Sequence, residues 1–252
     1  MNFQLEICAN SVQSAIEAQK GGATRVELCD NIYEGGTTPS YGTVAFAREV
    51  LDIKLHIIVR PRGGDFLYSD TEFEIMKRDV QMANQLKVDG IVIGILDKNG
   101  DVDKLRTSEL VKLAGNMSVT FHRAFDMTPD PKKALEEVIK CGCDRVLTSG
   151  QQNKALDGKN LIKDLILQAN DRISIMPGSG INADNICDLT TYCGAKEFHL
   201  SGRTAIESEM IYRKEGIYMG GLPQIPEYEQ FVTDKSKVSE IVSMLNQYNL
   251  GL

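Results

Sequence analysis

The chain has 252 residues, of which 42% are hydrophobic, and its formal net charge at pH 7 is −7. A chain of this length and composition can bury the core of one large domain, so we expect a single domain over residues 1–252. The acidic balance argues against nucleic acid and anionic membrane surfaces as partners. No apolar run approaches the roughly 20 residues that span a bilayer, and the N-terminus lacks a basic signal region. These features predict a cytoplasmic protein.

Short apolar runs that are typical of strands alternate with helix-like stretches along the chain. The predicted strands lie at residues 5–9, 25–30, 56–62, 90–96, 118–126, 145–150, 173–180 and 197–203. Helices are expected between them, with Ser11, Asp70 and Asp130 opening the first, third and fifth. A loop at about 204–234 and a closing helix at about 235–249 complete the chain. Eight β-then-α units predict a closed (β/α)8 barrel, the TIM barrel, with an open doubly wound sheet as the alternative.

Titratable side chains lie within strands that should be continuously apolar in a parallel sheet. They are Glu6, Glu27, Arg60, His122 and His199. Because a buried ion is costly unless partners satisfy it, these residues predict an internal ion-pair network, a functional site, or both. In a network, Glu6, Glu27 and Arg60 neutralise one another. In a site, Arg60 binds an anionic substrate and His122 moves protons, so the candidate catalytic residues are Glu27, Arg60, His122 and His199.

Glycine-containing turns after the last two strands predict an anion site. The active site of such a barrel lies at the C-terminal ends of its strands, where this chain has long polar loops. We expect residues 177–182 (PGSGIN) to turn straight into a helix that begins at Asn182, so that free N–H groups and the helix dipole attract an anion. Alternatively, the glycines only permit a tight turn. The predicted anion-binding residues are Arg62, Gly178, Gly180, Ser201 and Arg203.

Six cysteines without a secretory signal predict free thiols rather than disulfides. Cys8 and Cys29 occur in the same Glu-x-Cys pattern on the first two strands, so their thiols can face each other near the top of the barrel. Thiolates are soft ligands that select Cu(I) over hard cations, which makes this pair a candidate metal site. A free cysteine more often packs as a small hydrophobic residue, and that alternative stays open.

Several long segments together resemble the CutC family. They are RVELCDNIYEGGTTPSYG, IIVRPRGGDFLYS, VTFHRAFDM, RVLTSG and EFHLSGR, and the similarity extends from Leu5 to about Val238. The resemblance implies a cytoplasmic TIM barrel that forms homo-oligomers, takes part in copper tolerance and binds copper. The copper-binding thiols that it implies correspond to Cys8 and Cys29. Ser179 departs from the family pattern, in which a third glycine is more common.

The sequence supports two main hypotheses of function. In the first, the protein serves copper homeostasis and binds Cu(I) through Cys8 and Cys29. In the second, it is an enzyme, such as a lyase, isomerase or hydrolase, that acts on a small phosphorylated or carboxylated metabolite. A barrel that has lost its chemistry is a third alternative. The expected partner is thus a copper ion or an anionic small molecule, and the apolar residues within 204–234 predict a lid or, as we favour, a homo-oligomer contact.

Overall fold

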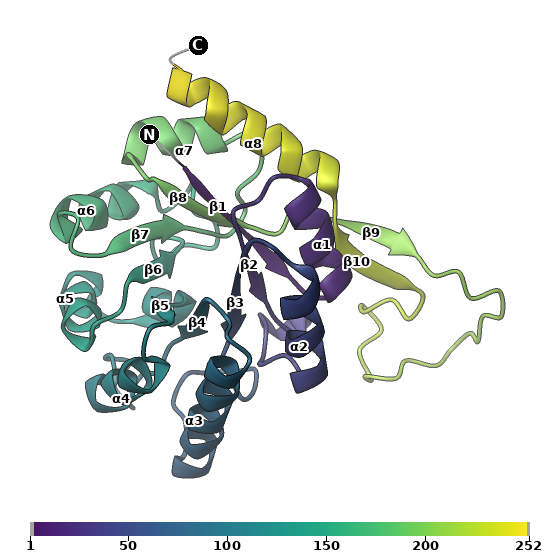
Figure 1. The fold of residues 1–252 in the computed structure, drawn as a ribbon, viewed down its shortest axis with the longest axis horizontal. Coiled ribbons are helices and arrows are strands. Elements are labelled where there is room, and N and C mark those ends of the chain that lie inside the picture. Colours follow the sequence, from purple (N-terminus) through teal and green to yellow (C-terminus); the bar gives the residue numbers. More distant parts are fainter. Residues whose placement is uncertain (1–2, 251–252) are drawn as a thin grey trace.

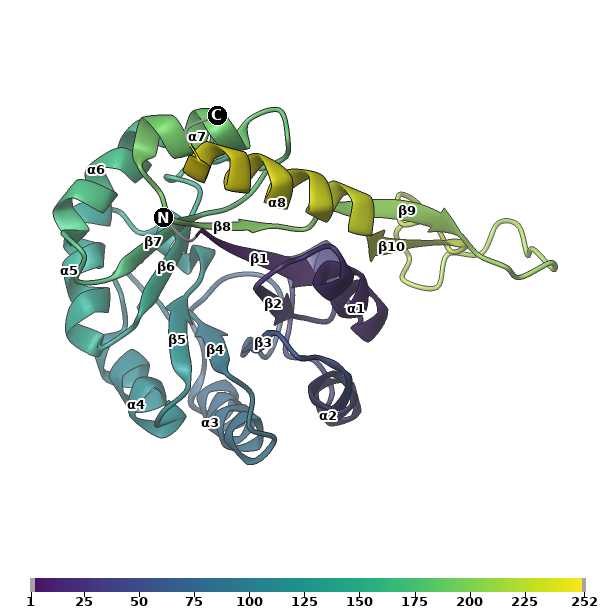
Figure 2. The ribbon, with the colours of Figure 1, turned by 45° about the horizontal axis from the view of Figure 1, so that its top comes forward.

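The computed structural model of the protein describes residues 3–250, and its eight parallel strands form a barrel surrounded by helices (Figures 1 and 2). The barrel strands are β1 (Gln4–Ala9), β2 (Arg25–Leu28), β3 (Lys54–Ile58), β4 (Gly90–Ile93), β5 (Ser118–Phe121), β6 (Arg145–Thr148), β7 (Ser174–Pro177) and β8 (Glu197–Leu200). Their order in the sheet is β7-β6-β5-β4-β3-β2-β1-β8, and a bridge between Gly178 and His199 joins its two outer strands. The predicted TIM barrel is therefore confirmed, with a nearly closed ring.

Helices follow the strands and cover the outside of the barrel. They are α1 (Val12–Lys20), α2 (Tyr41–Val50), α3 (Asp70–Gln85), α4 (Lys104–Ala114), α5 (Pro131–Cys141), α6 (Lys159–Ala169), α7 (Ile186–Cys193) and α8 (Lys235–Leu250), with 3-10 turns η1 (Ile32–Glu34) and η2 (Arg123–Met127). Ser11 and Asp130 cap α1 and α5, as predicted, because each side chain accepts backbone N–H groups of the first turn. At α3 the prediction is wrong: Ser69 is the cap rather than Asp70, and Glu72 completes a capping box.

The segment predicted as a loop at 204–234 contains an antiparallel hairpin. β9 (Arg203–Glu207) pairs with β10 (Glu229–Thr233), and the residues between them project away from the barrel in both ribbon views (Figures 1 and 2). Because β9 buries none of its side chains, it lacks the alternation of apolar and polar residues by which a half-buried strand is recognised. We call residues 203–233 the arm. After it, α8 packs beside α1 and α7.

The pairing register places functional side chains of neighbouring strands at the same height inside the barrel. Glu6 lies opposite Arg25 on β2 and opposite His199 on β8, and Cys8 lies opposite Glu27. Side chains alternate along each strand, so these residues share the inner face while the residues between them face the helices. The five titratable residues predicted to lie in strands are all buried, none more than 9% exposed. Arg60 and His122, however, follow the ends of β3 and β5 rather than lying within them, contrary to the prediction.

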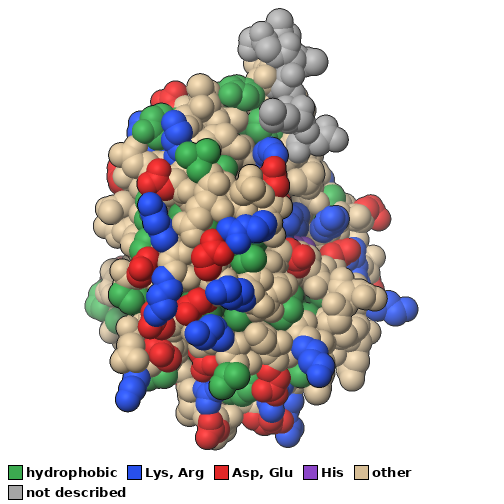
Figure 3. Space-filling view, turned by 90° about the vertical axis from the view of Figure 1, so that its left-hand side faces the viewer, with side chains coloured by type: hydrophobic (Ala, Val, Ile, Leu, Met, Phe, Trp, Pro, Cys, Tyr) green, Lys and Arg blue, Asp and Glu red, His purple; other side chains and the backbone are tan. Residues whose placement is uncertain are grey.

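Basic and acidic side chains are interspersed over the helical face shown in Figure 3. In the helical layer, Arg172 binds Glu136 at 2.7 Å and Lys133 binds Asp101 at 2.7 Å. Exposed ion pairs of this kind stabilise a protein by about 1 kcal/mol at most. Within residues 3–250, none of the helices combines the length and the apolar character that a membrane crossing requires.

Candidate functional site

The N-terminal half of the barrel interior holds a buried ion network. Arg25 donates to Glu6 through Nε and to Glu197 through Nη2, the latter at 2.7 Å, and Arg145 also donates to Glu197. Arg25 and Glu6 are at most 2% exposed. The prediction that Arg60 neutralises Glu6 is therefore wrong. Arg25 was not among the residues predicted from the sequence, although alternation along β2 places it on the same face as the glutamate two positions later.

Two thiols, a carboxylate and an imidazole come together at the C-terminal ends of β1, β2 and β8. The Sγ atoms of Cys8 and Cys29 lie 3.9 Å apart. His199 faces Glu6 through Nδ1 at 2.7 Å and Glu27 through Nε2 at 3.7 Å. One ligand atom each from Cys8, Glu27 and His199 lies within 4.8 Å of the other two. The structure thus brings Cys8, a predicted metal ligand, next to two residues that were predicted as catalytic.

Burial and neighbouring charges govern the protonation of this cluster. Burial opposes protonation of His199, but hydrogen bonds to Cys8 and Glu6 and nearby carboxylates raise its pKa well above its usual range. Burial also opposes ionisation of Glu6, yet Arg25 holds the pKa of that carboxyl well below its usual range. Burial raises the pKa of Glu27 to about 7. The hydrogen bond with the facing thiol, together with burial, raises the pKa of Cys8, so a metal ion must displace its proton.

A pocket of about 300 Å³ opens onto this cluster at the mouth of the barrel. All four predicted catalytic residues line it: Glu27, Arg60, His122 and His199. Arg123 and Asp126 line it as well, and the sequence analysis did not assign them a role. Asp126 pairs with Arg123 at 2.7 Å and accepts the backbone N–H of Ser149 at 3.0 Å, so it ties η2 to the loop after β6. Their signal in the sequence was their position within segment 118–126, which was predicted as a strand and also contains His122.

The two arginines that follow β3 bind loops of the chain itself. Arg60 donates through Nη1 and Nη2 to three backbone carbonyls of adjacent loops, at 2.7 to 2.9 Å. Arg62 donates to the carboxylates of Glu72 at 2.6 Å and Asp65 at 3.0 Å. Most of the N–H groups that the sequence analysis assigned to an external anion are thus engaged within the protein.

The glycine turn after β7 does not run straight into a helix, contrary to the prediction. α7 begins at Ile186 rather than Asn182. A Cβ atom on Gly178 would lie 2.5 Å from a leucine of β6, and one on Gly180 would lie 2.9 Å from the side chain of Lys154. Close packing therefore accounts for Gly178. Gly180 has a φ of +69°, the left-handed backbone conformation that a tight turn needs, as the alternative interpretation proposed.

The remaining candidates for anion binding lie at the base of the arm. The Ser201 carbonyl accepts a hydrogen bond from Thr233 Oγ1 at 3.2 Å. The guanidinium of Arg203 lies 5.2 Å above the ring of Phe231. The structure does not gather the five predicted anion-binding residues around one point. Arg62, the glycine turn and the two residues at the base of the arm each contact a different part of the chain.

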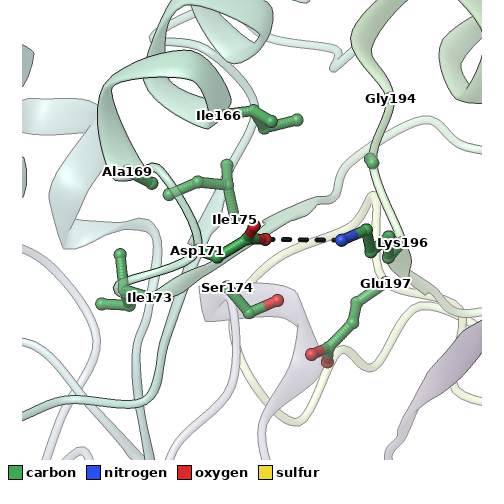
Figure 4. Close-up of a pocket in the computed structure, with 10 residues that line it drawn as sticks. Ile166, Ala169, Asp171, Ile173, Ser174, Ile175, Gly194, Lys196 and Glu197 are labelled. Atoms are coloured by element: carbon green, nitrogen blue, oxygen red, sulfur yellow. Dashed lines mark hydrogen bonds and ion pairs between the residues drawn. The ribbon is translucent and has the colours of Figure 1, made fainter.

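A second pocket, of about 250 Å³, lies at the N-terminal ends of β7 and β8 (Figure 4). Its walls include the apolar side chains of Ile166 and Ile175, and Asp171 faces Lys196 at 3.4 Å. Glu197 of the ion network also reaches this pocket. Active sites of TIM barrels lie at the opposite end, so the mouth with its thiols and imidazoles is the candidate functional site.

Comparisons with known proteins agree with the fold and extend over nearly the whole chain. The crystal structure of a protein assigned as a copper homeostasis protein CutC, from Streptococcus agalactiae, has a TM-score of 0.76 at 36% identity and covers 79% of this chain and 98% of its own. A thiamine phosphate pyrophosphorylase from Pyrococcus furiosus has a TM-score of 0.59 at 14% identity over 97% of this chain and 96% of its own, which shows a likeness of fold alone.

Sequence relatives are closer. A family protein CutC from Bacteroides fragilis is 50% identical over 245 residues, which cover 97% of this chain and 98% of the relative. A copper homeostasis protein cutC homolog from Mus musculus is 47% identical over 94% of this chain and 87% of the relative. The model of the CutC family matches residues 3–204. These matches confirm the resemblance inferred from the sequence motifs, and the chain belongs to the CutC family.

Proposed function

We propose that the protein binds Cu(I) through Cys8 and Cys29 and serves copper homeostasis. The observation that carries this proposal is the approach of the sulfur atoms of half-buried Cys8 and buried Cys29 to 3.9 Å at the mouth of the barrel. Metal–sulfur bonds in proteins are about 2.3 Å long, so one ion between these sulfurs is within reach of both. Two thiolates form a soft donor set, which favours Cu(I) over hard cations. The names of the relatives, which refer to copper homeostasis, support the same metal.

His199 and Glu27 adjoin the thiol pair and complete its surroundings. Both present a ligand atom within 4.8 Å of one on Cys8. The carboxylate of Glu27 can approach an ion held by the sulfurs, whereas His199 must first lose its proton. The pocket of about 300 Å³ gives the site an opening toward solvent, through which a metal ion can enter and leave. Such access suits an ion that is cargo rather than a permanent structural centre.

An anaerobic Cu(I) titration against a colorimetric chelator tests this proposal. We expect the reduced wild-type protein to take one equivalent of Cu(I) from the chelator, since the chain has one facing pair of thiols at the mouth. X-ray absorption of the loaded protein should show sulfur ligands, as expected for thiolate donors. No competition with the chelator, or a copper environment without sulfur, would contradict the proposal.

We propose further that the arm contacts a second copy of the chain, in the cytoplasm, where reducing conditions keep its cysteines as free thiols. Large apolar side chains of the arm are exposed, Ile211 by 98% and Met219 by 83%. Exposed apolar groups that cluster on one segment are typical of protein contacts. α2 offers a second apolar surface with Tyr41 and Phe46, so each copy carries both halves of a reciprocal interface.

Charges placed on the arm should therefore shift the protein toward the monomer. We expect light scattering after size exclusion to give a multiple of 27.9 kDa for the wild type and a mass near 27.9 kDa for Ile211→Glu/Met219→Glu. Leu105→Glu is the matched control, because Leu105 is 86% exposed on α4, away from the arm. A monomeric wild type, or the same assembly in the arm variant, would refute this interface.

A further inference from the structure

Arg60 carries a buried positive charge that no carboxylate of the described residues neutralises within 4.0 Å. The residue is 5% exposed. Its three hydrogen bonds go to neutral backbone carbonyls, and its Nε has no partner among residues 3–250. The carboxylate of Glu34, which lines the same pocket, accepts a hydrogen bond from Asn31 instead. A buried guanidinium without a contacting counter-ion is costly, so Arg60 can accept the negative charge of a ligand.

His122 offers an unused hydrogen-bond donor in the same pocket. The residue is 5% exposed, and its Nδ1 accepts the backbone N–H of Ala124 at 3.1 Å. In the neutral ring the proton then resides on Nε2, which has no partner within the described part of the chain. Burial and the positive charge of Arg60 lower the pKa of His122 to about 3, so the ring stays neutral at physiological pH. An unpaired buried N–H group is costly unless a ligand accepts it.

Phe66 lies between these two groups. Its ring centre is 5.1 Å from Cζ of Arg60 and 5.1 Å from the centre of the His122 ring. The rest of the pocket wall includes apolar side chains, among them Ile58 and Leu147. The ring therefore packs against both the guanidinium and the imidazole, and we expect a ligand that contacts both groups to displace it.

We propose that this pocket binds a small organic monocarboxylate, whose charge neutralises Arg60 and whose oxygen accepts the Nε2–H of His122. One positive charge without a contacting counter-ion matches a monoanion, whereas a dianionic phosphate would bring a second negative charge close to the carboxylates of Glu27, Glu34 and Asp126, which line the same pocket. The apolar residues contact the hydrocarbon part of the ligand. Neither Cys8 nor Cys29 binds the carboxylate, although Cys8 lines the same pocket, so this site goes beyond Cu(I) binding.

The histidine signals of the wild-type protein provide a direct test. The chain has only three histidines, so long-range ¹H–¹⁵N spectra of the imidazole rings resolve His122 from the other two. We expect benzoate to shift the His122 signals in a saturable manner. Benzamide has the same shape without the charge, and inorganic phosphate is mainly dianionic when the comparison is made at a pH of about 8. Both should bind roughly tenfold or more weakly than benzoate, since a charged hydrogen bond contributes about 1.5–3 kcal/mol.

Calorimetry on variants tests the assigned groups. His122→Phe should weaken benzoate binding roughly tenfold, because the donor is lost. Phe66→Ala should strengthen it, because no ring has to move. Thr107→Val is the matched control: it also removes an unpaired buried polar atom, but on α4 and outside the pocket, so benzoate affinity should not change.

Absence of saturable binding in both the wild type and Phe66→Ala would overturn the proposal, and so would equal affinity for benzoate and benzamide. If His122→Phe fails to fold, benzoate binding by Phe66→Ala still tests the proposal, because this variant keeps both Arg60 and His122. A wild-type protein that binds benzoate but not Cu(I) would refute the metal site alone. A wild-type protein that binds Cu(I) but not benzoate would refute the carboxylate site alone.

Discussion

Replacing both Cys8 and Cys29 with serine is expected to weaken Cu(I) binding by at least about a thousandfold, which corresponds to about 4 kcal/mol. Serine keeps the size of the side chain but exchanges a soft sulfur donor for a hard oxygen with little affinity for Cu(I). Glu27 and His199 would remain, and both are poor substitutes because one is an oxygen donor and the other is protonated and bound to Glu6.

Competition with a Cu(I) chelator under anaerobic conditions measures this loss. Cys187→Ser/Cys193→Ser is a matched control, since it removes the same number of thiols from α7, away from the pocket at the mouth. We expect the control to bind Cu(I) as tightly as the wild type. Unchanged affinity in the Cys8 and Cys29 variant would exclude this pair as the copper site.

Arg25→Leu is expected to lower the free energy of unfolding by about 3–5 kcal/mol at pH 7, the usual cost of removing one partner from a buried ion pair. Arg25 contacts both Glu6 and Glu197, and Glu6 is fully buried. After the substitution, Glu197 keeps Arg145, whereas Glu6 keeps His199 but loses its guanidinium. The loss of stability is thus concentrated on the buried carboxylate of Glu6.

The effect should depend on pH in a defined direction. In the wild type the folded-state pKa of Glu6 is depressed, so its contribution to stability is present above the unfolded value of about 4.5 and is lost as pH falls through the folded value. In the variant, burial without Arg25 raises the pKa of Glu6, and protonation then relieves the unpaired charge. The difference between the two proteins should therefore be largest at neutral pH and shrink as pH falls toward 4.5.

Urea unfolding of the wild type and of Arg25→Leu at several pH values measures both the size of the destabilisation and its dependence on pH. The double substitution Glu6→Gln/Arg25→Leu should recover part of the lost stability, because the glutamine amide carries no charge and still offers His199 an acceptor. A loss below about 1 kcal/mol at neutral pH, typical of exposed pairs, would show that the network is not a buried one in solution.

The architecture could be predicted from the sequence because each unit of the barrel carries a local signal. Short apolar runs mark the strands, and Ser11 and Asp130 mark helix starts through contacts that lie within one turn. Where local signals compete, the prediction missed: Ser69 and Asp70 are both good caps, and only the bond with Glu72 selects Ser69. β9 was missed because none of its side chains is buried.

The candidate site could be predicted only in part. Alternation along the strands brought the thiols of Cys8 and Cys29 to the inner face and to neighbouring strands, and their sulfurs do approach. Alternation does not say which side chain on another strand becomes the partner of a charge. Arg60 was therefore assigned to the glutamates, although its N–H groups reach loop carbonyls, and Arg25 was overlooked.

The sequence by itself determined the βα repeat, the burial of the in-strand charges and the family, because these depend on residue type and local spacing. Only the tertiary structure decided which charges meet. The barrel register sets Glu6 beside Arg25 and His199. The contact with His199 depends on pairing between the first and last strands, which are far apart in the chain. A shift of one residue in register would turn every one of these side chains to the opposite face, so the site exists only once the barrel has closed.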